Sequence, residues 1–165
     1  MPRLKILSVS EQNEFDSPPV LSGDNRKTQF RFNQVVQEMI KPIKSDNHRI
    51  GFVLMFYYFK IVQKFFPPQL FYHPDIKYVT RQLKILDFKA DNFQLDKYSF
   101  KRYKSKILLY YAYSSFDKPA KILLHQKIYL LAKSHVKPKV IFNDCVDLLL
   151  VEKIELPRYN AIHNV

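Results

Sequence analysis

Apolar residues recur at helical spacing along most of this chain, and the clearest example begins at Asp46. From there to Pro67 an apolar residue falls every three or four positions, which predicts a helix with one broad apolar face. The members of that face are Ile50, Val53, Leu54, Tyr57, Tyr58, Ile61, Val62 and Phe65. Pro67 and Pro68 end the helix, because proline lacks the N–H that a helix interior requires.

A second helix is expected to begin at His73-Pro74-Asp75, and its two sides differ in character. One side is apolar, with Ile76, Val79, Leu83 and Leu86, and the other is basic, with Lys77, Arg81 and Lys84. This division is typical of a helix that covers a core with one face and meets solvent with the other.

Capping residues and prolines delimit the remaining elements. Before Asp46 we expect a short helix around Glu11 to Phe15 capped by Ser8 or Ser10, a loop with a helical turn over 20–32, and a helix from Asn33 to Ile40. Beyond residue 90 we expect helices from Leu95 to Tyr113, from Pro119 behind the cap Asp117, from Pro138, and after Pro157. The expected inward residues of the last two long helices are Ile122, Leu123, Ile128 and Leu131, then Ile141, Cys145, Leu148 and Leu149.

Composition supports an all-α fold class, a compact multi-helix domain. Gly occurs only twice, whereas hairpins and phosphate-binding loops depend on the positive φ that Gly adopts easily. With 165 residues and 47% hydrophobic residues, the chain can bury a core of its own. We expect either one domain over residues 1–165 or two packed helical lobes, about 1–90 and 91–165.

The charge of the chain favours a polyanionic partner. Lys and Arg number 27 against 15 Asp and Glu, a formal net charge of +12. A fold does not need this excess, and nucleic acid is its usual explanation, with an anionic membrane surface as the less frequent one. Lysine-rich codon usage in the source proteome is a further explanation that involves no partner.

Other patterns narrow the compartment and the function class. Cys145 is the only cysteine, so no intrachain disulfide forms. The N-terminus turns polar too early for a secretory signal, and the apolar stretch 50–66 contains Lys60 and Lys64 and falls short of a membrane span. We therefore expect a cytoplasmic protein in a reducing compartment, associated with the nucleoid when bound to DNA.

The usual catalytic patterns are missing from the sequence. It contains no Gly-rich phosphate loop, no GxSxG elbow and no HExxH motif, and its five histidines are scattered. Asp144 and Asp147 lie one helical turn apart, which is typical of a solvated face, and Cys145 falls at an apolar helical position that predicts core packing. We expect no catalytic site, no metal and no cofactor in this chain.

Three basic and polar clusters carry the residue types that contact phosphates and base edges. The first surrounds a short helix and contains Arg26, Lys27, Thr28, Gln29, Arg31 and Gln34. The second flanks the start of the long helix and contains Lys41, Lys44, Asn47, His48 and Arg49. The third is the run Lys101, Arg102, Lys104 and Lys106, with Tyr98, Tyr103 and Tyr110 interleaved. For any one cluster, a solvated helix face is an equally good interpretation.

Four segments and the first residues occur in the same order as in a known family. They are MPRLKILSVSEQ (1–12), DNHRIGFVLMFYYFK (46–60), VTRQLKI (79–85), YSFKRYKSKILLYYAYSSF (98–116) and LLLVEKIELPRYNAI (148–162). Together they make the chain resemble the N-terminal region of the Tn-three family of replicative transposases. The resemblance covers nearly the whole chain and departs from the family pattern at three places, where Tyr103 replaces a histidine, Ala112 a glycine, and Ser99-Phe100 a Thr-Arg pair.

The resemblance implies a helix-turn-helix-like fold that binds the terminal inverted repeats of a transposon as double-stranded DNA. It also implies that the catalytic DDE-type module of the family lies further C-terminal, outside this chain. The residues expected to contact DNA are Lys27, Thr28, Gln29, Arg31, Gln34, Lys44, His48, Arg49, Ser99, Lys101, Arg102, Tyr103, Lys104 and Lys106. Base readout would fall to some of Gln29, Arg31, Asn33, Gln34, Ser99, Arg102 and Tyr103.

Two other function classes remain open at this point. The 11 Tyr and 14 Phe exceed what a small core needs, so the chain is alternatively a module for self-association or protein assembly without base readout. A stand-alone nuclease is the third hypothesis, and it requires a carboxylate site that the sequence does not provide.

Overall fold

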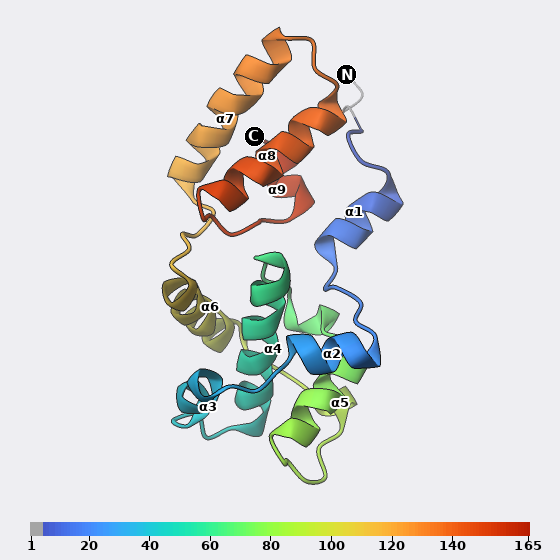
Figure 1. The fold of residues 1–165 in the computed structure, drawn as a ribbon, viewed down its shortest axis with the longest axis vertical. Coiled ribbons are helices and arrows are strands. Elements are labelled where there is room, and N and C mark those ends of the chain that lie inside the picture. Colours follow the sequence, from blue (N-terminus) through green and yellow to red (C-terminus); the bar gives the residue numbers. More distant parts are fainter. Residues whose placement is uncertain (1–4) are drawn as a thin grey trace. The chain divides into compact units, whose positions relative to one another are not determined.

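The chain is helical throughout the part described by the computed structural model, residues 5–165 (Figure 1). This part contains nine α-helices and two short 3-10 helices and no β-strand, so the predicted all-α fold class is confirmed. The first four residues of the opening MPRLKILSVSEQ motif lie outside the described residues.

The chain divides into two compact units. The central unit is Pro18–Ile107, and the terminal unit combines the residues up to Ser17 with Leu108–Val165. The sequence-based prediction of two lobes placed their boundary near residue 90. In the structure the boundary near residue 107 falls within a helix, and the N-terminal segment packs with the C-terminal part of the chain. In each unit two consecutive helices pack together across a link of four or five residues, residues 41–45 in one unit and 134–137 in the other.

The central unit is built around one buried helix. Its helices are α2 (Gly23–Gln29), α3 (Gln34–Ile40), α4 (Asp46–Val62), α5 (His73–Gln82) and most of α6 (Lys97–Tyr111), with 3-10 turns at Pro68–Leu70 and Ala90–Asn92. All ten residues from Ile50 to Phe59 on α4 are buried, so neighbours surround this helix on all sides. The prediction of a single apolar face was therefore too narrow. Helix α4 also ends earlier than expected, because Gln63 adopts the left-handed conformation (φ 53°) that closes a helix.

Helix α5 is shorter than its apolar pattern predicted. It ends at Gln82, and Lys84 adopts a left-handed conformation (φ 55°) that turns the chain away from the helix axis. Leu86 was expected on the inward side, but it lies beyond this turn and is 86% exposed. The prediction for Leu86 was wrong because it assumed one more helical turn.

The terminal unit has its own hydrophobic core. Its helices are α1 (Val9–Asp16), α7 (Lys118–Lys133), α8 (Pro138–Val151) and α9 (Tyr159–His163). Cys145 belongs to this core, which confirms its predicted packing role, and burial raises the pKa of its thiol. The prediction was wrong for Ile122, which is 51% exposed: α7 packs through Ala120 and Leu124, and a residue two positions from each lies about 200° around the helix.

Helix α1 is fixed to α8 and α9 by three contacts. The Phe15 ring meets Phe142 edge-on at 5.3 Å, the Tyr159 backbone N–H donates to Asp16 Oδ1 at 2.9 Å, and the Lys139 ammonium pairs with the Glu11 carboxylate. The Lys139 contact, aided by the Ser8 backbone N–H and hydroxyl, lowers the pKa of Glu11 from 4.5 to about 2.

The ion pair between Glu11 and Lys139 should make the thermal stability of the protein depend on pH. Because the pKa of Glu11 is lowered in the folded state, its ionised carboxylate stabilises the fold above pH 4.5. This stabilisation is lost as the pH falls toward about 2. A Lys139→Ala variant should therefore melt below the wild type at about pH 6, and the gap should close near pH 2. Thermal unfolding followed by circular dichroism measures both midpoints. Lys137→Ala serves as the control, and a gap for Lys139→Ala that stays constant over this range would contradict the assignment.

Candidate nucleic-acid interface

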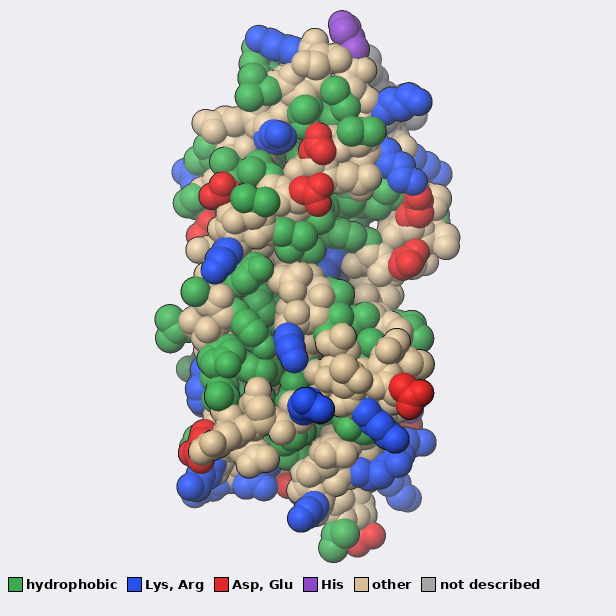
Figure 2. Space-filling view, viewed as in Figure 1, with side chains coloured by type: hydrophobic (Ala, Val, Ile, Leu, Met, Phe, Trp, Pro, Cys, Tyr) green, Lys and Arg blue, Asp and Glu red, His purple; other side chains and the backbone are tan. Residues whose placement is uncertain are grey.

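Positive charge is concentrated in the central unit. Residues 18–107 contain 17 Lys and Arg against 7 Asp and Glu, a net charge of +10, whereas the rest of the chain contains 10 against 8. The overall charge of +12 therefore belongs almost entirely to one unit. In Figure 2 the Lys and Arg side chains on the visible face of this unit gather over α2, α3 and α5.

Helix α6 presents half of its circumference to solvent, and this half is basic. Two neighbouring i, i+4 rows make up what we call the α6 basic face: Lys97, Lys101 and Ser105 in one row, and Tyr98, Arg102 and Lys106 in the next. All six residues are exposed, and none of them is acidic. The Lys106 ammonium lies 5.8 Å from the Phe52 ring centre, and the Arg102 guanidinium lies 5.2 Å from that of Tyr103. Ring contacts of this kind position the two cations at the protein surface.

The opposite side of α6 faces the core, and two of the expected DNA contacts lie there. Ser99 is 5% exposed and Tyr103 is 4% exposed. The Ser99 backbone N–H donates to Asp96 Oδ1 at 2.7 Å, while the Tyr103 ring packs edge-on against Phe52 at 5.4 Å. Buried side chains cannot reach a base edge, so the prediction of base contacts is corrected for Ser99 and Tyr103. Lys104, also on this side, is half-buried with its ammonium 5.5 Å from the Phe65 ring centre.

The second and third sequence clusters meet at one point. His48, in the first turn of α4, lies with its ring 5.9 Å from Tyr103 and its Nε2 3.2 Å from Asp96 Oδ2. Hydrogen bonds from the Ser99 backbone N–H and hydroxyl hold the pKa of Asp96 below its ordinary value, and His48 lowers it further. The carboxylate of Asp96 thus occupies the start of α6, where an incoming phosphate would otherwise find free backbone N–H groups.

Arg49 also has an internal role. Its Nε donates to the Ile43 carbonyl oxygen at 2.5 Å, which fixes the link between α3 and α4. Because Arg49 and His48 are both half-buried and engaged, Lys41 and Lys44 are the exposed cations of the second cluster. The buried helix α4 itself offers no face that could enter a DNA groove.

The first cluster is divided between solvent and structure. Lys27 and Thr28 on α2, Arg31 in the following loop, and Gln34 at the start of α3 are exposed, whereas Gln29 is half-buried. The loop is held by the Tyr57 hydroxyl, which donates to the Arg31 carbonyl oxygen at 2.5 Å. Burial raises the pKa of Tyr57 to about 12, so this donor keeps its proton at neutral pH. Asn33 is exposed, and its Oδ1 accepts a hydrogen bond from the Val36 N–H at 2.9 Å as the cap of α3.

Arg26 is the member of the first cluster whose role is entirely structural. Its Nε lies 2.7 Å from Asp75 Oδ1, and the Tyr58 hydroxyl donates to the other carboxylate oxygen at 2.5 Å. Asp75 is 1% exposed, and burial together with this carboxylate raises the pKa of Tyr58. This buried network joins α2, α4 and α5, and no local sequence pattern predicted it.

The sequence interpretation also left one basic surface unassigned. Lys77, Arg81 and Lys84 are exposed on or just after α5, which packs beside α2 through the Arg26–Asp75 pair. The one-sided charge of α5 was visible in the sequence, but its position next to the basic residues of α2 was not.

Two structural features are absent from residues 5–165: a cluster of metal-ligating side chains and a membrane-spanning helix. No group of three His, Cys, Asp or Glu side chains in this range is arranged to hold a metal ion. No helix in it combines the length and the apolar character of a membrane span.

Comparison with known proteins adds one finding. No curated protein matches the chain. One family model matches residues 6–165, which include both units almost completely. The chain therefore belongs to the DUF4158 family, which is described as a domain of unknown function.

Proposed function

We propose that this chain is the N-terminal DNA-binding part of a Tn-three-type transposase and that it binds the terminal inverted repeats of the transposon. The observation that carries the proposal is the concentration of charge: residues 18–107 hold +10, and several of their exposed cations lie on α2, α5 and α6. The resemblance of the ordered sequence segments to that transposase family supplies the identity of the DNA. The chain would position the inverted repeat while a separate catalytic module cuts the strand.

The α6 basic face is the best candidate for insertion into the major groove. It is the longest exposed basic helix surface of the central unit, and it offers Arg102 and Ser105 to base edges with Lys97, Lys101 and Lys106 beside them for phosphates. Of the residues expected from the sequence, the exposed set that remains is Lys27, Thr28, Arg31, Gln34, Lys44, Lys101, Arg102 and Lys106.

Fluorescence anisotropy with an inverted-repeat duplex and a scrambled duplex tests the proposal. The repeat should be preferred roughly a thousandfold for a complete site, and less for one isolated domain. The double variant Lys101→Glu with Lys106→Glu should reduce the log–log salt slope by about 1.8, because each lost phosphate contact removes about 0.9.

The matched control changes the charge equally on the other unit. Lys118→Glu with Lys121→Glu alters two exposed lysines at the start of α7 and should leave the slope near that of the wild type. An equal loss in both variants would show that net charge alone drives binding. Equal affinity of the wild type for the repeat and the scrambled duplex would refute inverted-repeat recognition.

Self-association is the second candidate function, and the terminal unit favours it. Large apolar side chains are exposed there on two helices: Ile122, Tyr129 and Leu130 on α7, and Val140 and Val151 on α8. Sedimentation velocity separates the two functions, because concentration-dependent dimers without DNA affinity would support assembly and a monomer that binds DNA would oppose it.

A further inference from the structure

The outer face of α5 is a cationic surface without acidic residues. Lys77 and Arg81 are one helical turn apart and exposed, and Lys84 follows in the left-handed turn that ends the helix. The only carboxylate of α5, Asp75, points inward and is neutralised by Arg26. Within the described residues no ion pair engages Lys77, Arg81 or Lys84, so their charges repel one another without local compensation.

Helix α2 adds to this surface because it is locked onto α5. The Arg26–Asp75 pair at 2.7 Å and the contact of the Phe30 ring with Tyr78 at 6.1 Å join the two helices. Lys27, the next residue after Arg26, is exposed on α2. Figure 2 shows Lys and Arg side chains gathered over the part of the central unit where α2 and α5 lie.

A fixed arrangement of cations suits a fixed array of phosphates. Lysines on flexible segments lose conformational entropy when they bind, whereas a rigid surface loses only side-chain freedom. Here the backbone under all four cations belongs to helices or a tight turn supported by the aromatic core around Phe30, Tyr57 and Tyr58. Exposed Lys and Arg side chains on such a backbone can pair with the repeated negative charges of a DNA duplex.

We propose that Lys27, Lys77, Arg81 and Lys84, the α2–α5 surface, form a second contact surface for the phosphate backbone of duplex DNA, distinct from the α6 basic face. The inference rests on the proposed function, since it assigns a further contact surface to the same DNA-binding unit. Unlike the base contacts proposed for the α6 basic face, binding by the α2–α5 surface requires only duplex phosphates and no particular base sequence.

The test measures the salt dependence of binding to a mixed-sequence duplex. Lys77→Glu with Arg81→Glu should reduce the log–log slope by about 1.8, and combination with the α6 double variant should reduce it by about 3.6 if both surfaces bind at once. Lys77→Gln with Arg81→Gln removes the same two contacts without charge reversal, so it should also reduce the log–log slope by about 1.8. The α7 double variant is the control for net charge.

The outcomes separate this inference from the proposed function. An unchanged slope in both α5 variants, with a reduced slope in the α6 variant, overturns the α2–α5 surface and leaves DNA binding intact. Reduced slopes in the α5 variants without any preference for the inverted repeat support the surface and refute repeat recognition. No binding of the wild type to any duplex at low salt overturns both, and binding to anionic vesicles in place of DNA would identify the surface as a membrane contact.

Discussion

An Asp75→Ala variant is expected to lose about 3–5 kcal/mol of the free energy of unfolding. The substitution leaves the Arg26 guanidinium beside a hydrophobic core with no counter-charge and deprives the Tyr58 hydroxyl of its acceptor. Breaking one side of a buried ion pair costs more than the pair contributes, because the remaining charge stays desolvated. Arg26 is 17% exposed and can turn partly toward water, so the loss should fall in the lower half of this range.

Chemical denaturation of the wild type and the variant measures this loss. Asp91→Ala is the matched control: it removes an aspartate from the same unit, but its pair with His73 at 3.2 Å is exposed and should contribute no more than about 1 kcal/mol. Similar losses in the two variants would show that the Arg26–Asp75–Tyr58 network does not support the central unit.

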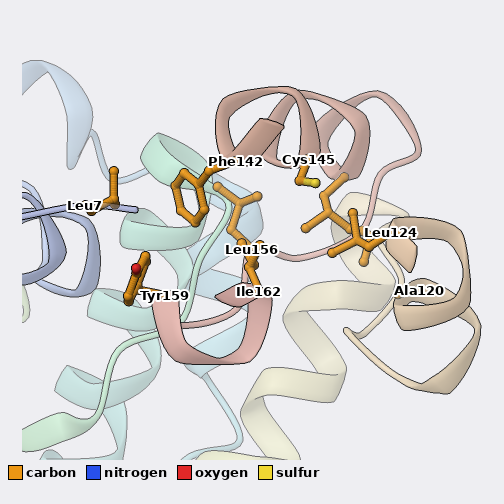
Figure 3. Packing of buried hydrophobic residues seen from close by; sticks show 10 residues of the cluster. Leu7, Ala120, Leu124, Phe142, Cys145, Leu156, Tyr159 and Ile162 are labelled. Atoms are coloured by element: carbon orange, nitrogen blue, oxygen red, sulfur yellow. The ribbon is translucent and has the colours of Figure 1, made fainter. Parts of the chain in front are cut away.

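The second large effect is expected for Phe142→Ala in the terminal unit, which should cost about 3–5 kcal/mol. Phe142 is buried between α1 and α9, with its ring 5.3 Å from Phe15 and 5.5 Å from Tyr159. Figure 3 shows it among the buried residues of this core, together with Tyr159 and Leu156. Truncation therefore leaves a cavity that three helices would have to close.

Calorimetry and DNA titration together make this variant informative about the two units. Below its lowered melting temperature, Phe142→Ala should bind duplex DNA with the wild-type salt slope, because the charge lies in the central unit. Val140→Ala on the same helix is the control, and its partly exposed side chain should change stability by no more than about 0.5 kcal/mol. A reduced slope in Phe142→Ala would place DNA contacts in the terminal unit.

Local signals in the sequence predicted the helices well. Asn33, Asp117 and Pro138 are found at the starts of α3, α7 and α8, because capping and proline preferences depend only on neighbouring residues. Helix ends were less accurate, since the left-handed residues Gln63 and Lys84 are not glycines and gave no recognisable stop signal.

The candidate site was predicted only in part, because exposure depends on long-range packing. The run around Lys101 was recognised as basic, but the side of α6 that faces the core is set by Phe52 on α4, about fifty residues away in the chain. The inward role of Arg26 depends likewise on Asp75. Periodicity therefore identified most of the helices, while the bounds of the two units and the choice between surface and core residues required the structure.

The division of the chain has a consequence for the order in which the protein folds during synthesis. The central unit is one continuous stretch, so all its contacts become available once the ribosome has released residue 107. Helix α1 is synthesised before the central unit, but its partners Phe142 and Tyr159 emerge after that unit, more than a hundred residues later than α1. A nascent chain should thus present a folded basic unit while α1, with its Phe15 side chain still uncovered, waits for α8 and α9.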